Sequence, residues 1–230
     1  MCGRIALYTP PQRLARLLEA TLAAGLDPEG RPSWNVGPQR TLFGVADTGA
    51  GRVLDRYKWG LLPSWAKDPS MSNRMFNARS ETVASKPSFR SAFKRQRLLV
   101  PVDGFFEWDR GGSAKVPHYF TRADGAPIVL AGLYERWRDP SGGEDAPWLQ
   151  TCTVLTTTQG PDIDGIHDRM PVVLEPDAFD VWLTAGDDER DAVQALCIPA
   201  PAGTLVHHRV DAKVGNVRND GPELIEEIAP

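Results

Sequence analysis

The sequence has few cysteines, no long apolar run and no excess of positive charge, and each of these absences excludes a class of protein. Three cysteines in 230 residues, without motif spacing, argue against a disulfide framework and for a reducing cytosol. The apolar runs span only a few residues, so no transmembrane helix is predicted, and no secretion signal is visible at the N-terminus. We therefore expect a cytoplasmic protein without a membrane partner.

The charge balance is mildly acidic, with 26 basic and 30 acidic residues and a net charge of −4. This composition counts against nucleic-acid binding through bulk charge. The basic residues are unevenly spread, however, because five of them fall within twelve positions that contain no acid: Lys86, Arg90, Lys94, Arg95 and Arg97. A local basic face and an ordinary solvated helix face fit this run equally well.

The patterning predicts one domain over residues 1–230, because no internal repeat or low-complexity linker divides the chain. A first helix is predicted from Thr9 through Leu22, with Gly25 as its stop. Short β-like runs occur at 41–46, 53–59, 97–102, 127–134, 148–156 and 204–210, and shorter helical patterns at 86–96, 177–183 and 187–196. Because the strands outnumber the helices and lie close in sequence, we expect an α+β domain of mainly antiparallel strands, in a barrel-like or sandwich core with several peripheral helices.

Cys2 directly follows the initiator Met1, and cysteine is small enough for the usual removal of that methionine. Removal would leave an α-amine and a thiol on one residue. The amine condenses with an aldehyde to a Schiff base, and the thiol then closes on the same carbon to form a thiazolidine ring. With an amine pKa near ~8 and a thiol pKa near ~8.5, a useful fraction of free amine exists at pH 7. An N-terminal cysteine could equally be the nucleophile of an amidohydrolase, and most such cysteines have no catalytic role.

Several further segments accompany Met1-Cys2-Gly3-Arg4 in a fixed order. They are Trp34-Asn35-Val36-Gly37-Pro38, Trp59-Gly60-Leu61-Leu62-Pro63-Ser64-Trp65, Asn77-Ala78-Arg79-Ser80-Glu81-Thr82, Gly104-Phe105-Phe106-Glu107-Trp108, Ile166-His167-Asp168-Arg169-Met170-Pro171 and the closing Val214 to Ile225. Together they resemble the SRAP family, the SOS-response-associated peptidase domain of abasic-site processing proteins. The resemblance covers essentially the whole chain.

The resemblance implies a covalent cross-link between Cys2 and the open-chain aldehyde of an abasic site in single-stranded DNA, which shields the lesion from strand cleavage. Asn77 would orient the N-terminal amine and bond the sugar oxygens, Glu107 would assist ring opening, and His167 would move protons. Aromatic neighbours of Glu107, if they enclose its carboxyl, would raise its pKa towards neutrality.

DNA contacts are expected beside these catalytic positions. Arg4, Arg79 and Arg169 each lie within two residues of one of them, where guanidinium groups could grip phosphates without reading sequence. Pro38 and Trp65 could stack on or wedge between bases, although core packing is the competing interpretation for Trp65. No cofactor or metal is predicted, since three cysteines and four histidines show no ligand spacing. Abasic single-stranded DNA is the expected partner, and replication-fork proteins stay open as further partners.

Two other functions fit the same residues. In a cysteine peptidase or amidohydrolase, Cys2 with His167 and Asn77 or Glu107 would supply nucleophile, base and orienter, and the activity could be confined to removal of Met1. A non-catalytic binder of single-stranded DNA would use Arg79, Trp65 and the basic stretch 86–97.

Overall fold

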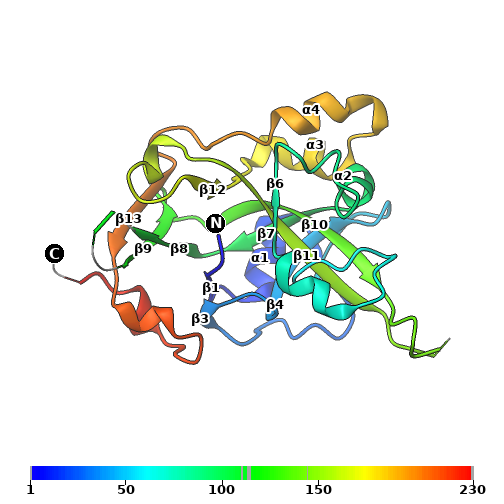
Figure 1. Cartoon of the computed structure of the whole chain (residues 1–230), viewed down its shortest axis with the longest axis horizontal. Coiled ribbons are helices and arrows are strands. Elements are labelled where there is room, and N and C mark those ends of the chain that lie inside the picture. Colours follow the sequence, from blue (N-terminus) through cyan, green and yellow to red (C-terminus); the bar gives the residue numbers. More distant parts are fainter. Residues whose placement is uncertain (1, 110, 113–114, 144, 229–230) are drawn as a thin grey trace.

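A closed β-barrel forms the core of the computed structural model, which describes residues 2–109, 111–112, 115–143 and 145–228 (Figure 1). Its strands are β4 (Thr41–Asp47), β5 (Arg52–Trp59), β7 (Arg97–Val102), β10 (Ile128–Trp137) and β11 (Leu149–Thr158). They pair in the order β11-β10-β7-β4-β5. The barrel closes because β11 also pairs with β5, in parallel, at Thr151↔Lys58 and Cys152↔Trp59.

Shorter strands extend the barrel, and a second sheet packs beside it. The barrel extensions are β2 (Thr21–Leu22) on β5, and β6 (Asn77–Arg79) and β12 (Arg169–Pro171) on β11. The second sheet has the order β13-β9-β8-β1-β3, from β1 (Ile5–Leu7), β3 (Ser33–Val36), β8 (Gly104–Asp109), β9 (Val116–Arg122) and β13 (Leu205–Arg209). The N-terminal strand β1 therefore lies between two neighbours rather than at an edge.

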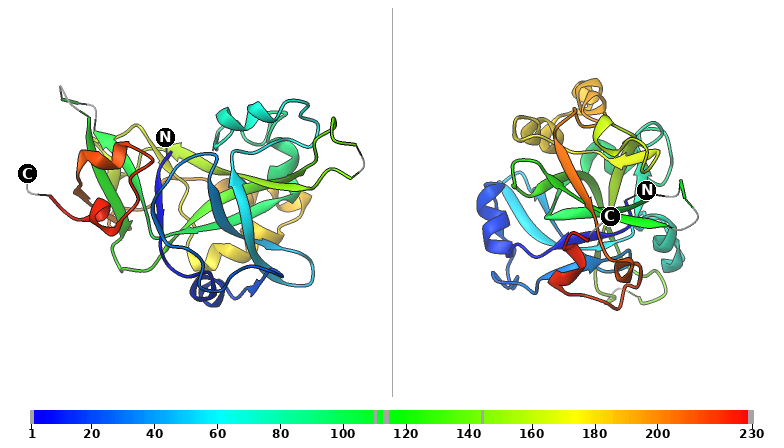
Figure 2. Two further views of the ribbon diagram at one scale, coloured as in Figure 1. Left: turned by 90° about the horizontal axis from the view of Figure 1, so that it is seen from below. Right: turned by 90° about the vertical axis from the view of Figure 1, so that its left-hand side faces the viewer.

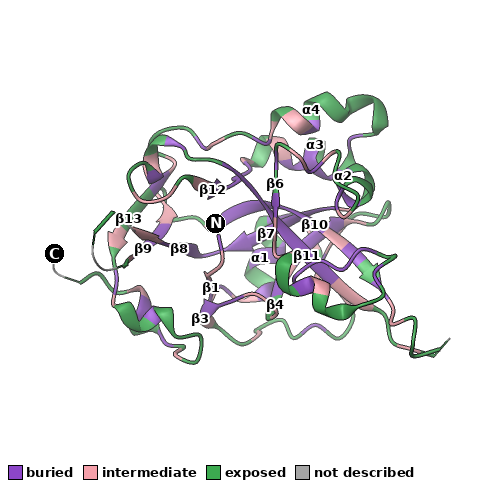
Figure 3. Cartoon of the chain, in the orientation of Figure 1, coloured by how far each residue is buried: buried purple, intermediate pink, exposed green. Residues whose placement is uncertain are grey.

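The helices are short and peripheral. The α-helices are α1 (Pro11–Leu17), α2 (Arg90–Arg95), α3 (Phe179–Thr184) and α4 (Arg190–Ala195), and 3-10 turns cover Pro69–Arg74, Pro161–Ile163, Pro176–Ala178, Asp187–Glu189, Ala212–Gly215 and Pro222–Ile225. Much of α2 and α4 is exposed, whereas the strands around the N-terminal end are buried (Figure 3). Helix α1 lies on the opposite side of the barrel from that end (Figure 2). In the described part of the chain, no helix has the length and apolar character needed to cross a membrane.

The α+β barrel architecture predicted from the sequence is confirmed, as are the predicted strands, with boundary shifts of up to three residues. The apolar runs Leu98–Val100 and Ile128–Leu130 are fully buried, because both lie in central barrel strands. Cys152 and Cys197 are buried core residues, as their positions in the sequence indicate.

The prediction of a first helix reaching Leu22 and Gly25 is wrong. Helix α1 ends at Leu17, and Glu19 adopts a left-handed φ of 52°, which no continuing helix allows. Leu22 instead lies in β2, paired in parallel with β5. The other predicted helices are shortened to α2, α3 and α4 with adjoining 3-10 turns.

The basic stretch 86–97 is not a continuous surface, because Arg97 is buried in β7. Its guanidinium donates to the Phe93 and Lys94 carbonyls of α2, and to the Trp182 and Ala185 carbonyls at the end of α3. Burial lowers the pKa of Arg97. The exposed Lys94 in turn pairs with Asp187. A non-catalytic DNA binder that uses the stretch 86–97 would therefore lack part of the exposed positive charge on which that hypothesis depends.

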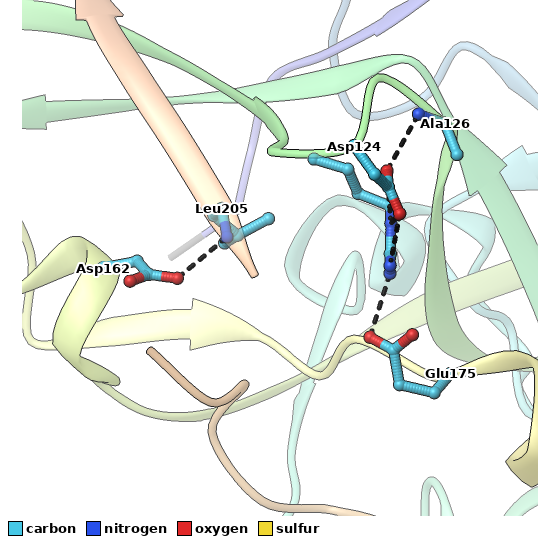
Figure 4. A network of polar contacts seen from close by, with 6 residues as sticks. Asp124, Ala126, Asp162, Glu175 and Leu205 are labelled. Atoms are coloured by element: carbon cyan, nitrogen blue, oxygen red, sulfur yellow. Dashed lines mark hydrogen bonds and ion pairs between the residues drawn. The ribbon is translucent and has the colours of Figure 1, made fainter. Parts of the chain in front are cut away.

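Side-chain bridges attach the loop that precedes β12 to the second sheet (Figure 4). The Asp162 carboxylate accepts backbone N–H bonds from Gly203 and Leu205, both at 2.8 Å, at the start of β13. Arg122 of β9 pairs with Asp124 and Glu175, each at 2.9 Å. The Asp162 bonds hold the segment that carries His167 against the sheet that carries Glu107, and the Arg122–Glu175 pair attaches the segment after β12 to the same sheet.

Gly60 ends β5 and begins the connection 60–76 that leads to β6. Its φ of 138° lies in the region that favours glycine, and a Cβ there would lie 2.5 Å from the Ser72 carbonyl oxygen. Gly60→Ala should therefore destabilise the protein by about 1–3 kcal/mol, measured by urea denaturation. Gly215→Ala is the matched control, since open space surrounds that position, and it should change stability by less than about 1 kcal/mol. Equal stabilities for the two variants would contradict this account of the turn.

Candidate active site

Cys2 lies three residues before the first residue of β1, and its side chain has no solvent exposure. Strand β1 is held on both sides, since Ile5 pairs with Val36 of β3 and with Phe105 of β8. The Arg4 backbone N–H donates to the Cys2 thiol. Met1 lies outside the described residues.

Asn77 fixes the backbone of Cys2 from the barrel side. It begins β6, which pairs in parallel with β11 at Val154. The Asn77 side-chain Nδ2 donates to the Cys2 carbonyl oxygen at 2.6 Å. The Asn77 Oδ1 is buried and has no hydrogen-bond partner among the described residues. This amide therefore holds the backbone of Cys2 with one atom and keeps an acceptor oxygen beside it.

Glu107 comes from β8 and is only 2% exposed. Strand alternation places its side chain on the same face as Phe105, which stacks on Phe120. The aromatic enclosure inferred from the sequence is therefore partial, because Phe106 and Trp108 belong to a cluster on the opposite face. The buried carboxylate lies close enough to the Cys2 thiol to influence its titration.

Burial raises the pKa of the Cys2 thiol well above its usual range, and the Glu107 carboxylate raises it further. Both effects oppose the charged thiolate: burial removes water from it, and the neighbouring negative charge repels it. The Arg4 N–H bond acts in the opposite direction and is the weakest of the causes. The thiol is therefore protonated at neutral pH.

His167 approaches Glu107 from the loop between the Pro161–Ile163 turn and β12. Its Nε2 lies 3.8 Å from Glu107 Oε2, and both side chains are nearly buried. Its Nδ1 lies 3.0 Å from the Arg169 backbone nitrogen and 2.9 Å from the exposed Asp168 carboxylate. His167 thus turns its Nε2 towards Glu107.

The four predicted catalytic side chains therefore converge on one site, although the sequence separates them by up to 165 positions. They come from the N-terminal segment, β6, β8 and the loop before β12. A near neighbour is His118, which lies opposite Glu107 in the β8–β9 register and has its Nδ1 3.1 Å from that of exposed His207. Burial lowers the pKa of both histidines.

The predicted DNA-contact arginines lie in three different environments. Arg79 of β6 is exposed beside the site. Arg169 is held by Glu81, at 2.5 and 3.1 Å, and by the Thr156 carbonyl at 2.6 Å. The Arg169 bond holds the pKa of the Glu81 carboxyl below its usual range, with a smaller effect from Arg79. Glu81 was not singled out by the sequence reasoning, although it lies within the segment that contains Asn77 and Arg79.

Arg4 points into the protein. Its guanidinium donates to Asn35 Oδ1 at 2.6 Å and to the Val214 carbonyl, and lies 5.8 Å from the centre of the Trp108 ring. The Asn35 Nδ2 in turn donates to the carbonyls of Val214, Asn216 and Asn219. The Trp34–Pro38 and Val214–Ile225 segments thus meet, and they brace the strand that follows Cys2.

Trp65 and Pro38 belong to neighbouring loops. Trp65, 56% exposed, lies in the 60–76 connection, and Pro38 is half-buried in the turn before β4. Ser72 of the connection donates its hydroxyl to Gln39 Oε1 at 2.9 Å, which links the two loops. Across the described residues, no three side chains of histidine, cysteine, aspartate or glutamate gather as metal ligands.

Comparisons with known proteins match nearly the full length of this chain to one family. The model of the SOS response associated peptidase (SRAP) family matches residues 1–217. The chain is 35% identical over 229 residues to the abasic site processing protein YoqW of Bacillus subtilis (strain 168), covering 98% of this chain and 99% of that protein. It is 33% identical over 268 residues to the abasic site processing protein HMCES of Gallus gallus, covering 99% and 78%. It is 30% identical over 237 residues to YedK of Escherichia coli (strain K12), covering 99% and 100%.

Solved structures share the fold. A protein from Bordetella bronchiseptica superimposes with a TM-score of 0.75 at 27% identity, covering 91% of this chain and 100% of that one. A protein from Bacteroides thetaiotaomicron gives a TM-score of 0.83 at 22% identity, covering 99% and 100%, and is similar in fold alone.

The contact between Glu107 and the thiol gives a pH prediction. Glu107→Gln removes the negative charge that raises the pKa of Cys2, so this pKa should fall towards its ordinary value and alkylation should begin at lower pH. The measurement is the pH profile of iodoacetamide modification at Cys2, located by mass spectrometry. Glu81→Gln is the control and should leave the profile unchanged. An unchanged or upward-shifted profile in Glu107→Gln would be evidence against the contact.

Proposed function

This chain belongs to the SOS response associated peptidase (SRAP) family, and we propose that it processes abasic sites in single-stranded DNA through a covalent bond to Cys2. The observation that carries the proposal is the convergence of Cys2, Asn77, Glu107 and His167 in one buried site. The relatives named abasic site processing proteins support it.

The proposed chemistry requires removal of Met1, which frees the α-amine of Cys2. A general acid-base group first opens the abasic deoxyribose to its aldehyde. The amine nitrogen then attacks the aldehyde carbon, and water leaves to give an imine. The thiol sulfur adds to the imine carbon while its proton passes to the nitrogen, which closes the thiazolidine. One water is lost overall, and no oxidant or cofactor takes part.

Each neighbouring group has a role in these steps. Glu107 transfers the proton that opens the sugar, and His167, whose Nε2 faces Glu107, carries protons for imine formation and ring closure. Asn77 Nδ2 holds the Cys2 carbonyl, which leaves Oδ1 to accept from the free amine. Preorganised in this way, two weak nucleophiles act in sequence on one carbon.

The burial of Cys2 beside the Glu107 carboxylate favours this chemistry over acyl transfer. A cysteine peptidase attacks with a thiolate, and its active site lowers the pKa of the thiol. Here burial and Glu107 raise the pKa of Cys2 instead. A protonated thiol suits a reaction in which the amine attacks first and the sulfur adds later to an imine. Peptidase activity is the alternative outcome in the following test.

Cross-linking can be tested with a single-stranded oligonucleotide that carries one abasic site, followed by a denaturing gel. Wild-type protein should give a heat-stable shifted band. Cys2→Ala should give none, and Cys2→Ser should give an adduct only after borohydride reduction, because it retains the amine but cannot form the thiazolidine. Cys197→Ala is the matched control and should cross-link like the wild type.

Intact-mass measurement completes that experiment, since it reports both loss of Met1 and addition of the abasic fragment. A heat-stable adduct from Cys2→Ser, or full activity in protein that retains Met1, would exclude the mechanism. Peptide cleavage without a band would support the acyl-transfer alternative. Salt-sensitive binding with neither activity would indicate a non-catalytic binder.

Arg79 is expected to hold a phosphate next to the lesion. Arg79→Ala should weaken single-stranded DNA binding to a similar degree for every flanking sequence, and lower the slope of log K against log salt by about 0.7. Fluorescence anisotropy at several salt concentrations measures both effects. Arg13→Ala removes the same charge from exposed α1 and is the control. A loss confined to particular flanking sequences would contradict a phosphate contact.

A further inference from the structure

An exposed tryptophan lies close to two arginines at the end of the β10–β11 pair that is far from the active site. Trp148, immediately before β11, is 55% exposed. The guanidinium carbons of Arg136 and Arg138 lie 5.2 and 5.0 Å from its ring centre. The proposed chemistry uses none of these three residues. They are called the Trp148 cluster below.

Arg136 extends from the face of the β10–β11 pair opposite to the one that packs on Leu62 and Ala66, and the cluster meets the 60–76 connection only at its edge, where Ser64 borders a hollow shared with Trp148. Register pairs Arg136 with Gln150 and Trp137 with Leu149, so alternate residues face opposite sides. Trp137 and Leu149 pack with Leu62 and Ala66, and Trp137 Nε1 donates to the Ala66 carbonyl at 2.7 Å. This packing anchors the strands that present the cluster.

Two hollows adjoin the cluster. One, of about 520 Å³, is bordered by Trp148, both arginines, Ser64 and Asp139. The other, of about 470 Å³, is bordered by Trp148, Arg136, Tyr57 and Tyr134. The Asp139 carboxylate, at the border of the first hollow, accepts from the Ser141 N–H and hydroxyl. Ser64 precedes exposed Trp65, so the first hollow reaches the loop that carries that tryptophan.

We propose that the Trp148 cluster is a second contact for single-stranded DNA, in which the indole stacks on a base and the two guanidinium groups hold the adjoining phosphates. The ligand class follows from the chemistry, because an aromatic ring flanked by cations suits a base and its phosphates without reading sequence. This inference rests on the proposed function, since the DNA strand that reaches the cluster is the one that carries the abasic site.

The position of the Trp148 cluster agrees with a path of single-stranded DNA that begins at the active site. Arg79 pairs with Thr156 and Asn77 with Val154, so the active site lies beside one end of β11, while Trp148 lies at the other end. The 60–76 connection covers the part of β11 between them, where the Leu62 N–H donates to the Thr151 hydroxyl, and its exposed Trp65 follows the Ser64 that borders the first hollow. Eight residues of strand span about 26 Å, or about eight stacked nucleotides. This length lies within the sites of known single-strand binders, about 4–16 nucleotides.

The stacking contact is tested on undamaged DNA, so that its outcome does not depend on cross-linking. Anisotropy with a labelled 20-nucleotide strand should show Trp148→Ala binding at least about fivefold more weakly than wild type. Trp148→Phe should retain most of the affinity, because it keeps a ring. Ile198→Ala, which shortens another exposed apolar residue, is the matched control and should bind like wild type. A thermal melt checks that each variant is folded.

The phosphate contacts proposed for Arg136 and Arg138 are tested by the salt dependence of DNA binding. The double variant Arg136→Ala/Arg138→Ala should lower the slope of log K against log salt by about 1.4, whereas the equal charge change Arg13→Ala/Arg16→Ala on α1 should not.

The length of the DNA path is tested with oligonucleotides that carry the lesion near one end and have arms of increasing length. They should bind wild type more tightly once one arm exceeds about eight nucleotides, and Trp148→Ala should lose this gain. If both cluster variants bind long strands like wild type, the inference is overturned. Failure of wild type to cross-link would instead overturn the proposed function.

Discussion

The fold depends on holding the first strand of the chain inside the protein. Chain ends are normally loosely held, because few contacts repay the entropy of ordering them. Here β1 is paired on both sides, Arg4 bonds to Asn35 and Val214, and the Cys2 carbonyl is bonded by Asn77. The C-terminal segment and the barrel thus both constrain Cys2 and the residues that link it to β1. A terminal amine placed on that residue would be held against fixed partners rather than sampling solvent.

The same burial sets the electrostatics of the site. A thiol and a carboxylate share a region with little water, where each charge affects the other more strongly than at the surface. The result is a protonated sulfur beside a buried acid, with His167 placed to exchange protons with Glu107. The proposed condensation requires protons to be moved repeatedly, and a buried acid beside a histidine meets that requirement.

Local sequence patterns predict much of the secondary structure, but they do not predict the contacts between segments that are far apart in the chain. The strand at 97–102 was predicted with its observed bounds, because a short apolar run buried on both faces has few alternatives. Leu22 was misassigned because its helical spacing continues past Glu19, and only the pairing with β5 shows that the helix has ended. The family resemblance is confirmed and supplied the candidate site residues. It could not show that Asn35 bonds three carbonyls near the C-terminus, since no local pattern encodes a contact across about 180 positions.

The burial of Arg97 has a consequence for how the barrel surface unfolds. The Arg97 guanidinium donates to the terminal carbonyls of both α2 and α3, and each helix has only six residues, too few to be stable alone. If either helix melted, a desolvated positive charge would lose half of its partners. The two helices and β7 should therefore open as a single cooperative unit, with amide hydrogens at both helix ends exchanging at a common rate.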